Sequence, residues 1–139
     1  MKYFILLITL LLASCTTMLV NPVDTSHKIN HICIERNPNV TVDDFLSIIE
    51  ALINEHSITT SIYDSKIPND CEFYLTYDAA EAWDFIFFLV SAKLWLYNHE
   101  TQIGFAQYRL KNGGGLDLNK WTSVEGKIRK LVDQLLVHH

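Results

Sequence analysis

The sequence predicts one two-layer α/β (α+β) domain, in which two helices cover one face of a mixed sheet of about five strands. Short apolar segments with strand-like alternation follow one another between residues 31 and 111. Two segments with a helical apolar stripe accompany them, one after the first strand and one at the chain end. Helices arranged in this way are typical of a sheet covered on one side. The predicted order is β-α-β-β-β-β-α.

The chain opens MKYFILLITLLLASCTT, which has the pattern of a secretory leader. Lys2 gives a positive end, and an apolar run then leads to small residues and Cys15. The run is shorter than the roughly 20 apolar residues that a membrane-spanning helix needs. We therefore expect residues 1–14 to be a signal peptide.

Leu12, Ala13, Ser14 and Cys15 resemble a bacterial lipobox. The resemblance implies that Cys15 becomes the first residue of the mature chain and carries a diacylglyceryl group and a further acyl chain such as palmitate. Several acyl chains make a durable anchor, because each buried methylene contributes about 0.8 kcal/mol. Thr16 stands where an aspartate would favour the inner membrane. The expected location is therefore the periplasmic face of the outer membrane.

Charge and composition exclude some classes of partner. The formal net charge is −5 for the whole chain, and removal of Lys2 with the leader makes it more negative. The sequence has no basic stripe, which disfavours nucleic acid as a partner. Attachment to the membrane is therefore assigned to the lipid on Cys15. The hydrophobic fraction of 49% is enough for a folded core.

Cys33 and Cys71 form an even pair once Cys15 is acylated. In an oxidising compartment such a pair predicts a disulfide. A metal site or a reactive thiol is the alternative, but no CxxC or CxxH spacing supports it. Both cysteines are expected near the starts of adjacent parallel strands, which would bring them within bridging distance.

The first half of the mature chain predicts a tether, a strand and a helix. Residues 15–30 lack periodicity and are expected to be a lipidated tether, with the single domain spanning 31–139. HICIER (31–36) predicts a strand and NPNVT (37–41) a turn. Thr41 is expected to cap a helix over about 42–56, with Asp44 completing an imperfect capping box. The apolar stripe of that helix comprises Phe45, Ile49, Leu52 and Ile53.

The second half predicts four strands and a closing helix. SITTSIYD (57–64) alternates as a strand, and CEFYLTYD (71–78) begins another that continues to about Trp83. A further strand is expected from about Leu89 to Tyr97, followed by a turn at NHET and a partner strand over 102–111. Charged residues within 79–97 argue against a membrane span. The closing helix is expected to begin with the capping box Thr122-Ser123-Val124-Glu125, and its stripe comprises Trp121, Val124, Ile128, Leu131 and Leu135.

The motifs ICIE, CEFYLTY, AWDF, AKLWLY, IGFAQYRL, GGGLDLNKW and KIRKLVDQLL resemble those of an uncharacterised family of short lipoproteins of Gram-negative bacteria. The resemblance covers nearly the whole mature chain. It implies a location in the cell envelope and no particular activity.

No motif predicts a catalytic site, a metal site or a cofactor. The glycine-rich segment NGGGLDLNK lacks the Gly-Lys-Ser/Thr of a phosphate-binding loop. The histidines have no zinc-ligand spacing. Asp78, Glu81 and Asp84 are close in sequence, but alternation along a strand would put Glu81 on the opposite face from the other two. These carboxylates support only the alternative function, a small periplasmic hydrolase acting on envelope glycan or lipid.

Aromatic residues in the strands give the main functional hypothesis. A two-layer fold leaves one sheet face without helices, and some aromatic side chains should lie there. The candidate partner surface comprises Trp83, Asp84, Trp95, Tyr97, Gly114, Lys120 and Trp121, although each of them can also be ordinary core or loop. The sequence thus favours a non-catalytic binding or assembly subunit of the envelope, with a protein partner that docks on a sheet face or edge.

Overall fold

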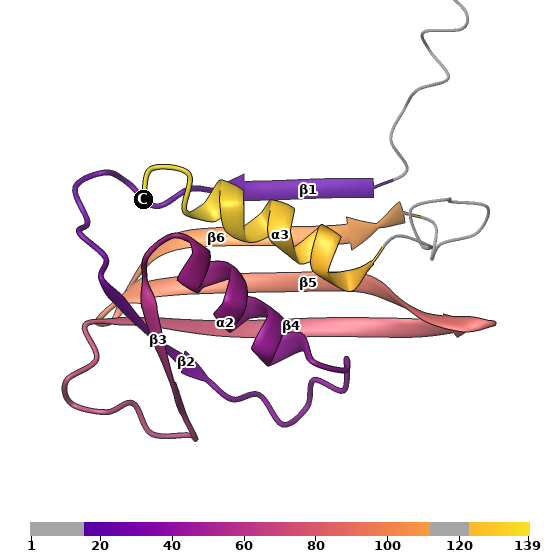
Figure 1. Cartoon of the computed structure of the whole chain (residues 1–139), viewed down its shortest axis with the longest axis horizontal. Coiled ribbons are helices and arrows are strands. Elements are labelled where there is room, and N and C mark those ends of the chain that lie inside the picture. The colour runs from indigo at the N-terminus through magenta and orange to yellow at the C-terminus, as the bar shows by residue number, and fades with distance from the viewer. Residues whose placement is uncertain (1–15, 112–122) are drawn as a thin grey trace, which may run out of the picture.

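Six strands form one mixed sheet, and two helices lie across one of its faces (Figure 1). The computed structural model describes residues 16–111 and 123–139. The elements are β1 (Thr16–Asn21), β2 (His31–Glu35), α2 (Phe45–Glu55), β3 (Thr59–Tyr63), β4 (Phe73–Asp84), β5 (Ile86–Asn98), β6 (Thr101–Leu110) and α3 (Val124–Leu135).

The strand order across the sheet is β1-β6-β5-β4-β2-β3. Strand β2 is parallel to both β3 and β4, whereas the other neighbours are antiparallel. Alternate residues of each strand face the helices and form the core, which includes Leu75, Leu94 and Ala106. The predicted fold class and the two helices on one face are therefore confirmed, with six strands in place of about five.

The additional strand is β1, in the segment that we expected to be a tether. It pairs with β6, and its Met18 and Val20 side chains pack against the core. The chain after β1 is also held, because Val23 is fully buried and its N–H donates to the carbonyl of Leu135 at 3.0 Å. Gly104 provides the room, since a Cβ there would lie 2.8 Å from side-chain atoms of both Val23 and Leu135. Residues 16–30 thus belong to the domain.

The two helices have the predicted apolar stripes, apart from Trp121, which lies outside the described residues, but they start differently. In α2, Phe45, Ile49, Leu52 and Ile53 are buried as expected. Asp44 occupies the N-cap position of α2, so the predicted cap at Thr41 is wrong. Asp44 has φ 57° and its side chain makes no capping hydrogen bond. Ser123 rather than Thr122 caps α3, because its hydroxyl accepts the N–H of Gly126 at 3.1 Å.

The long hairpin between β4 and β5 corrects the predicted start of the second strand. The second strand begins at Ile86 instead of about Leu89, and only Phe85 connects the two strands. Phe85 has φ 63°, in the left-handed region that bulky residues rarely adopt. The turn predicted at NHET is confirmed between β5 and β6.

The predicted disulfide between Cys33 and Cys71 is confirmed. Its Cα atoms are 6.1 Å apart, and it links the middle of β2 to the residues just before β4. Both cysteines and Tyr63 form a small buried cluster of their own, against which Tyr74 packs.

None of the described helices is long and apolar enough to cross a membrane.

Candidate interaction surface

Aromatic side chains line the sheet face opposite the helices. Tyr74 of β4 and Tyr97 of β5 are register partners, and their rings stack with centroids 4.8 Å apart. Next to them, the rings of Trp95 in β5 and Phe105 in β6 are 5.9 Å apart and tilted. Each of these four side chains is half-buried. We call these four residues the aromatic row.

Acidic groups lie beside the aromatic row. Burial raises the pKa of the Tyr74 phenol, and Tyr97, Glu100 and Glu35 raise it further. Burial is also the main cause of the raised pKa of Tyr63, whose hydroxyl lies 3.5 Å from Glu35 Oε2. The phenols are therefore neutral hydrogen-bond donors at physiological pH.

The predicted partner surface divides into separate parts. Trp95 and Tyr97 lie on the uncovered face. Trp83 lies farther along β4, about 23 Å beyond Thr76, the register partner of Trp95, at the usual rise per residue. Asp84 ends the same strand. Gly114, Lys120 and Trp121 fall outside the described residues.

The end of the β4–β5 hairpin is the most exposed apolar part of the described chain. Trp83 is 64% exposed, Phe85 83%, Ile86 46% and Phe87 66%. We call these four residues the hairpin tip. Sequence reasoning pointed to Trp83 but did not single out the other three, which fall between the strands expected to end at about Trp83 and to begin at about Leu89. The available signal was the run WDFIFF, which is apolar at every position but one and has no turn-forming glycine, proline or asparagine.

Within the described residues the sheet has two open edges, formed by β1 and β3. In β3, the N–H of Thr59 donates to Asn30 and the carbonyl of Tyr63 accepts from Arg36, both toward β2. The backbone groups of Thr60 and Ile62 therefore point away from the sheet. Neither TTMLVN in β1 nor TTSIY in β3 has a charged residue or a proline. Such residues are the usual protection of an edge strand against pairing.

The acidic residues of the hydrolase alternative do not form a recognisable centre. Asp78 lies opposite Lys93 in the ladder, and a register shift separates it from Glu81. Among the described residues, no group of three or more histidine, cysteine or acidic side chains is arranged to hold a metal ion.

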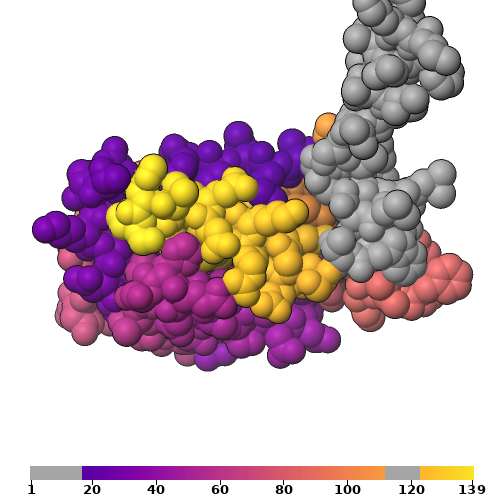
Figure 2. All heavy atoms as spheres, turned by 45° about the horizontal axis from the view of Figure 1, so that its top comes forward, coloured from indigo at the N-terminus to yellow at the C-terminus, as the bar shows by residue number. Residues whose placement is uncertain are grey.

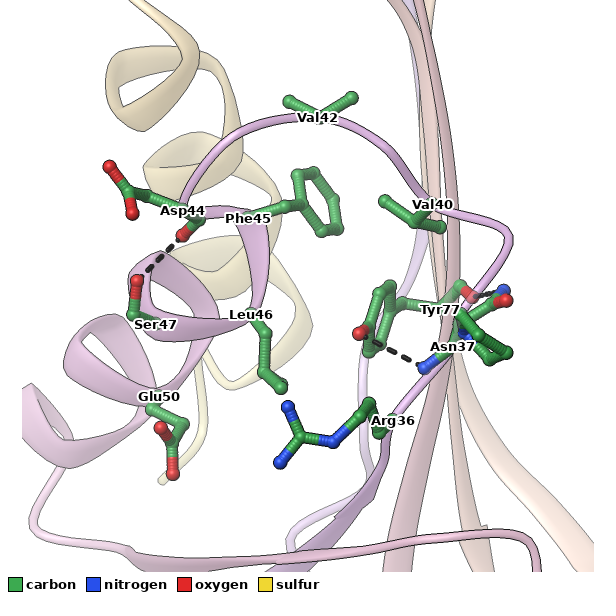
Figure 3. A pocket seen from close by; sticks show the side chains of 11 residues that line it. Arg36, Asn37, Val40, Val42, Asp44, Phe45, Leu46, Ser47, Glu50 and Tyr77 are labelled. Atoms are coloured by element: carbon green, nitrogen blue, oxygen red, sulfur yellow. Dashed lines mark hydrogen bonds between the residues drawn. The ribbon is translucent and has the colours of Figure 1, made fainter.

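A cleft of about 440 Å³ lies between the residues that follow β2 and the first turns of α2 (Figure 3). Its wall at Asn37 is held by Tyr77, whose hydroxyl accepts the Asn37 N–H at 3.2 Å. The Asn37 amide in turn donates to the Tyr77 carbonyl at 2.9 Å. Arg36 and Glu50 line opposite walls, but Arg36 pairs with Asp64 at 3.0 Å and Glu50 accepts a bond from Thr60. Local structure thus already uses the charged groups of Arg36 and Glu50.

Comparison with known proteins gives structural neighbours only. No family model and no curated protein matches the sequence. The structure resembles a PelC dodecamer from Paraburkholderia phytofirmans, with a TM-score of 0.56 and 9% sequence identity over 88% of this chain and 96% of that chain. A dodecamer of a single-substitution PelC variant from the same organism gives a TM-score of 0.57, also at 9% identity, over 88% and 95% of the two chains. The likeness shows a shared fold.

Proposed function

We propose that the chain is a lipid-anchored subunit of the bacterial cell envelope, which acts without catalysis by assembling with further copies of itself. The lipobox around Cys15 supports an anchor, and the disulfide suits an oxidising compartment. Structural neighbours that are dodecamers support self-assembly. The anchor would hold the assembly on the periplasmic face of the outer membrane.

The two unprotected sheet edges are the observation that carries this proposal. Strand β1 runs antiparallel to β6, and following the pairs across the sheet makes β1 antiparallel to β3. If copies stand side by side in the same orientation, β1 of one copy meets β3 of the next as an antiparallel pair. Such a pair extends the sheet without inverting any copy.

This contact is head-to-tail, and it closes into a ring when the rotation between copies allows closure. Rotation about an axis along the strands leaves every copy with the start of β1 at the same end. All Cys15 anchors would then face one membrane. The aromatic row would line one wall of the assembly.

Strand β3 offers a substitution that tests the edge contact with a matched control. Thr60→Pro removes an outward N–H and leaves the bonds to β2 in place, because proline is tolerated on edge strands. Thr60→Val loses the same hydroxyl but keeps the N–H. We expect light scattering after size-exclusion chromatography to find assemblies for the wild type and Thr60→Val, and monomers for Thr60→Pro.

The opposite result has a clear meaning. If Thr60→Pro remains folded by circular dichroism and assembles like the wild type, β3 is not a contact between copies. If the wild type itself is monomeric in detergent with its lipid attached, self-assembly is wrong.

A further inference from the structure

The hairpin tip projects past the other elements at one end of the sheet. Figure 1 shows β4 and β5 extending beyond the other strands, and Figure 2 shows the same salmon-coloured end standing out from the body of the molecule. Trp83, Phe85, Ile86 and Phe87 make this end apolar. An exposed apolar cluster of this kind marks a surface that contacts a partner or a membrane.

The start of β1 lies at the same end of the sheet. Thr17 pairs with Arg109, Arg109 with Ser91 and Ser91 with Ala80, which together define one row across four strands. The first residue of β1 and the C-terminal end of β4 lie on the same side of this row. Beyond the row, β4 and Phe85 continue for about five residues, or about 17 Å.

We propose that the hairpin tip inserts into the interface of the membrane that holds the lipid on Cys15. The inference rests on the proposed function for the anchor, since Cys15 directly precedes Thr16 and its lipid would set the bilayer surface close to the row. A tip that reaches about 17 Å beyond the row passes that surface. Its outermost part would then occupy the zone about 5–10 Å deep in which interfacial apolar residues lie.

The chemistry of the tip suits a bilayer interface. Tryptophan is favoured at the level of the lipid head groups, and phenylalanine is common on the apolar face of interfacial segments. The ladder continues to the end of the hairpin, since Trp83 pairs with Phe87 and Asp84 with Ile86. The backbone groups that face across the hairpin are therefore paired, and those that point outward from it would meet water and polar head groups at the interface. Asp84 limits the depth, because a carboxylate in the hydrocarbon core is costly.

Charged residues around the tip are mixed. Arg109 and Lys111 are exposed at the end of β6, where they can meet lipid phosphates, whereas Glu81 and Asp84 lie on β4. Binding of the hairpin tip to the membrane therefore does not depend on anionic lipid. Apolar burial would supply most of the binding energy.

Tryptophan fluorescence of the full, lipid-carrying chain tests the inference. The chain has three tryptophans, so Trp95→Phe with Trp121→Phe leaves Trp83 as the reporter. This variant is reconstituted into phosphatidylethanolamine and phosphatidylglycerol vesicles whose acyl chains carry bromine. We expect a blue-shifted emission, quenching by the brominated chains, and a fall of about two-fold or more in quenching by acrylamide.

The matched control keeps Trp95 as the reporter, through Trp83→Phe with Trp121→Phe. Trp95 lies on the uncovered face, about 23 Å along the strands from Trp83, and should show no quenching by brominated lipid. A Trp83 reporter that remains accessible to acrylamide in vesicle-bound protein would overturn the inference. Protection from acrylamide without quenching by brominated lipid would assign the tip to a protein contact and overturn it too.

Failure of the anchor can be told apart from failure of the tip. Mass spectrometry shows whether Cys15 carries acyl chains, and a chain without them contradicts the anchor alone. The quenching of Trp83 in the vesicle-bound fraction then still tests whether the hairpin tip inserts into the membrane. A chain with no vesicle-bound fraction would contradict both.

Discussion

Trp83 and Phe85 lie on either side of Asp84 with ring centroids 6.2 Å apart, although both side chains are largely exposed. The pair closes the end of a hairpin whose only connecting residue has a positive φ. A turn of this kind would normally use glycine or asparagine. The chain instead keeps an exposed phenylalanine where it costs conformational energy, which agrees with a role for this side chain outside the fold.

Phe85→Gly should separate stability from membrane contact. A left-handed conformation costs an L-residue about 1–2 kcal/mol, and glycine avoids that cost. We expect the melting temperature to stay the same or rise, whereas quenching of Trp83 by brominated lipid should fall. A large loss of stability would show that Phe85 supports the fold instead.

Cys15→Ala should remove the anchor. Without the thiol no diacylglyceryl group can form, so the chain should lose labelling by palmitate and leave the membrane fraction. Flotation of cell membranes on a sucrose gradient measures this. A variant that still floats with outer membranes would contradict the lipobox interpretation.

Loss of the disulfide should destabilise the domain. Cys33 and Cys71 are 38 positions apart, and the chain-entropy model assigns about 4 kcal/mol to a loop of that size. Replacing both cysteines by alanine should lower the free energy of unfolding in urea by about 2–4 kcal/mol. An unchanged midpoint of unfolding would argue against this contribution.

The ion pair between α2 and α3 should make the stability of the domain depend on pH. Arg129 of α3 bonds Glu55 of α2, and this bond is the main cause of the lowered pKa of Glu55. Because the folded-state pKa lies below the ordinary value of 4.5, the stabilisation is fully present above pH 4.5 and is lost as the pH falls through the folded-state pKa.

Melting temperatures of the wild type and Glu55→Gln test this dependence across acidic pH. The difference between the two proteins should be constant above pH 4.5 and shrink below it. A difference that grows toward low pH would contradict the assignment.

The helices and most strands could be predicted because local pattern specifies them. The stripe of Ile128, Leu131 and Leu135 has helical spacing, and all three side chains are buried. Strand β1 was missed because its pattern is short and it is stabilised by pairing with β6, far away in sequence. The other three residues of the hairpin tip were missed because Phe85 gives no local turn signal. The distance between Trp83 and Trp95 depends on the length of the hairpin. The expected second strand begins only at about Leu89, so the sequence predicts a shorter hairpin than the observed one.

The number of copies in the purified, lipid-carrying protein tests the central claim most directly. Native mass spectrometry from detergent should find assemblies of several copies for the wild type. Leu19→Lys, at a 60% exposed position of edge strand β1, should give monomers, whereas Val137→Lys, at a 57% exposed position beyond α3, should assemble normally. A wild type that is monomeric at every concentration, or Leu19→Lys assemblies like those of the wild type, would contradict self-assembly through the sheet edges.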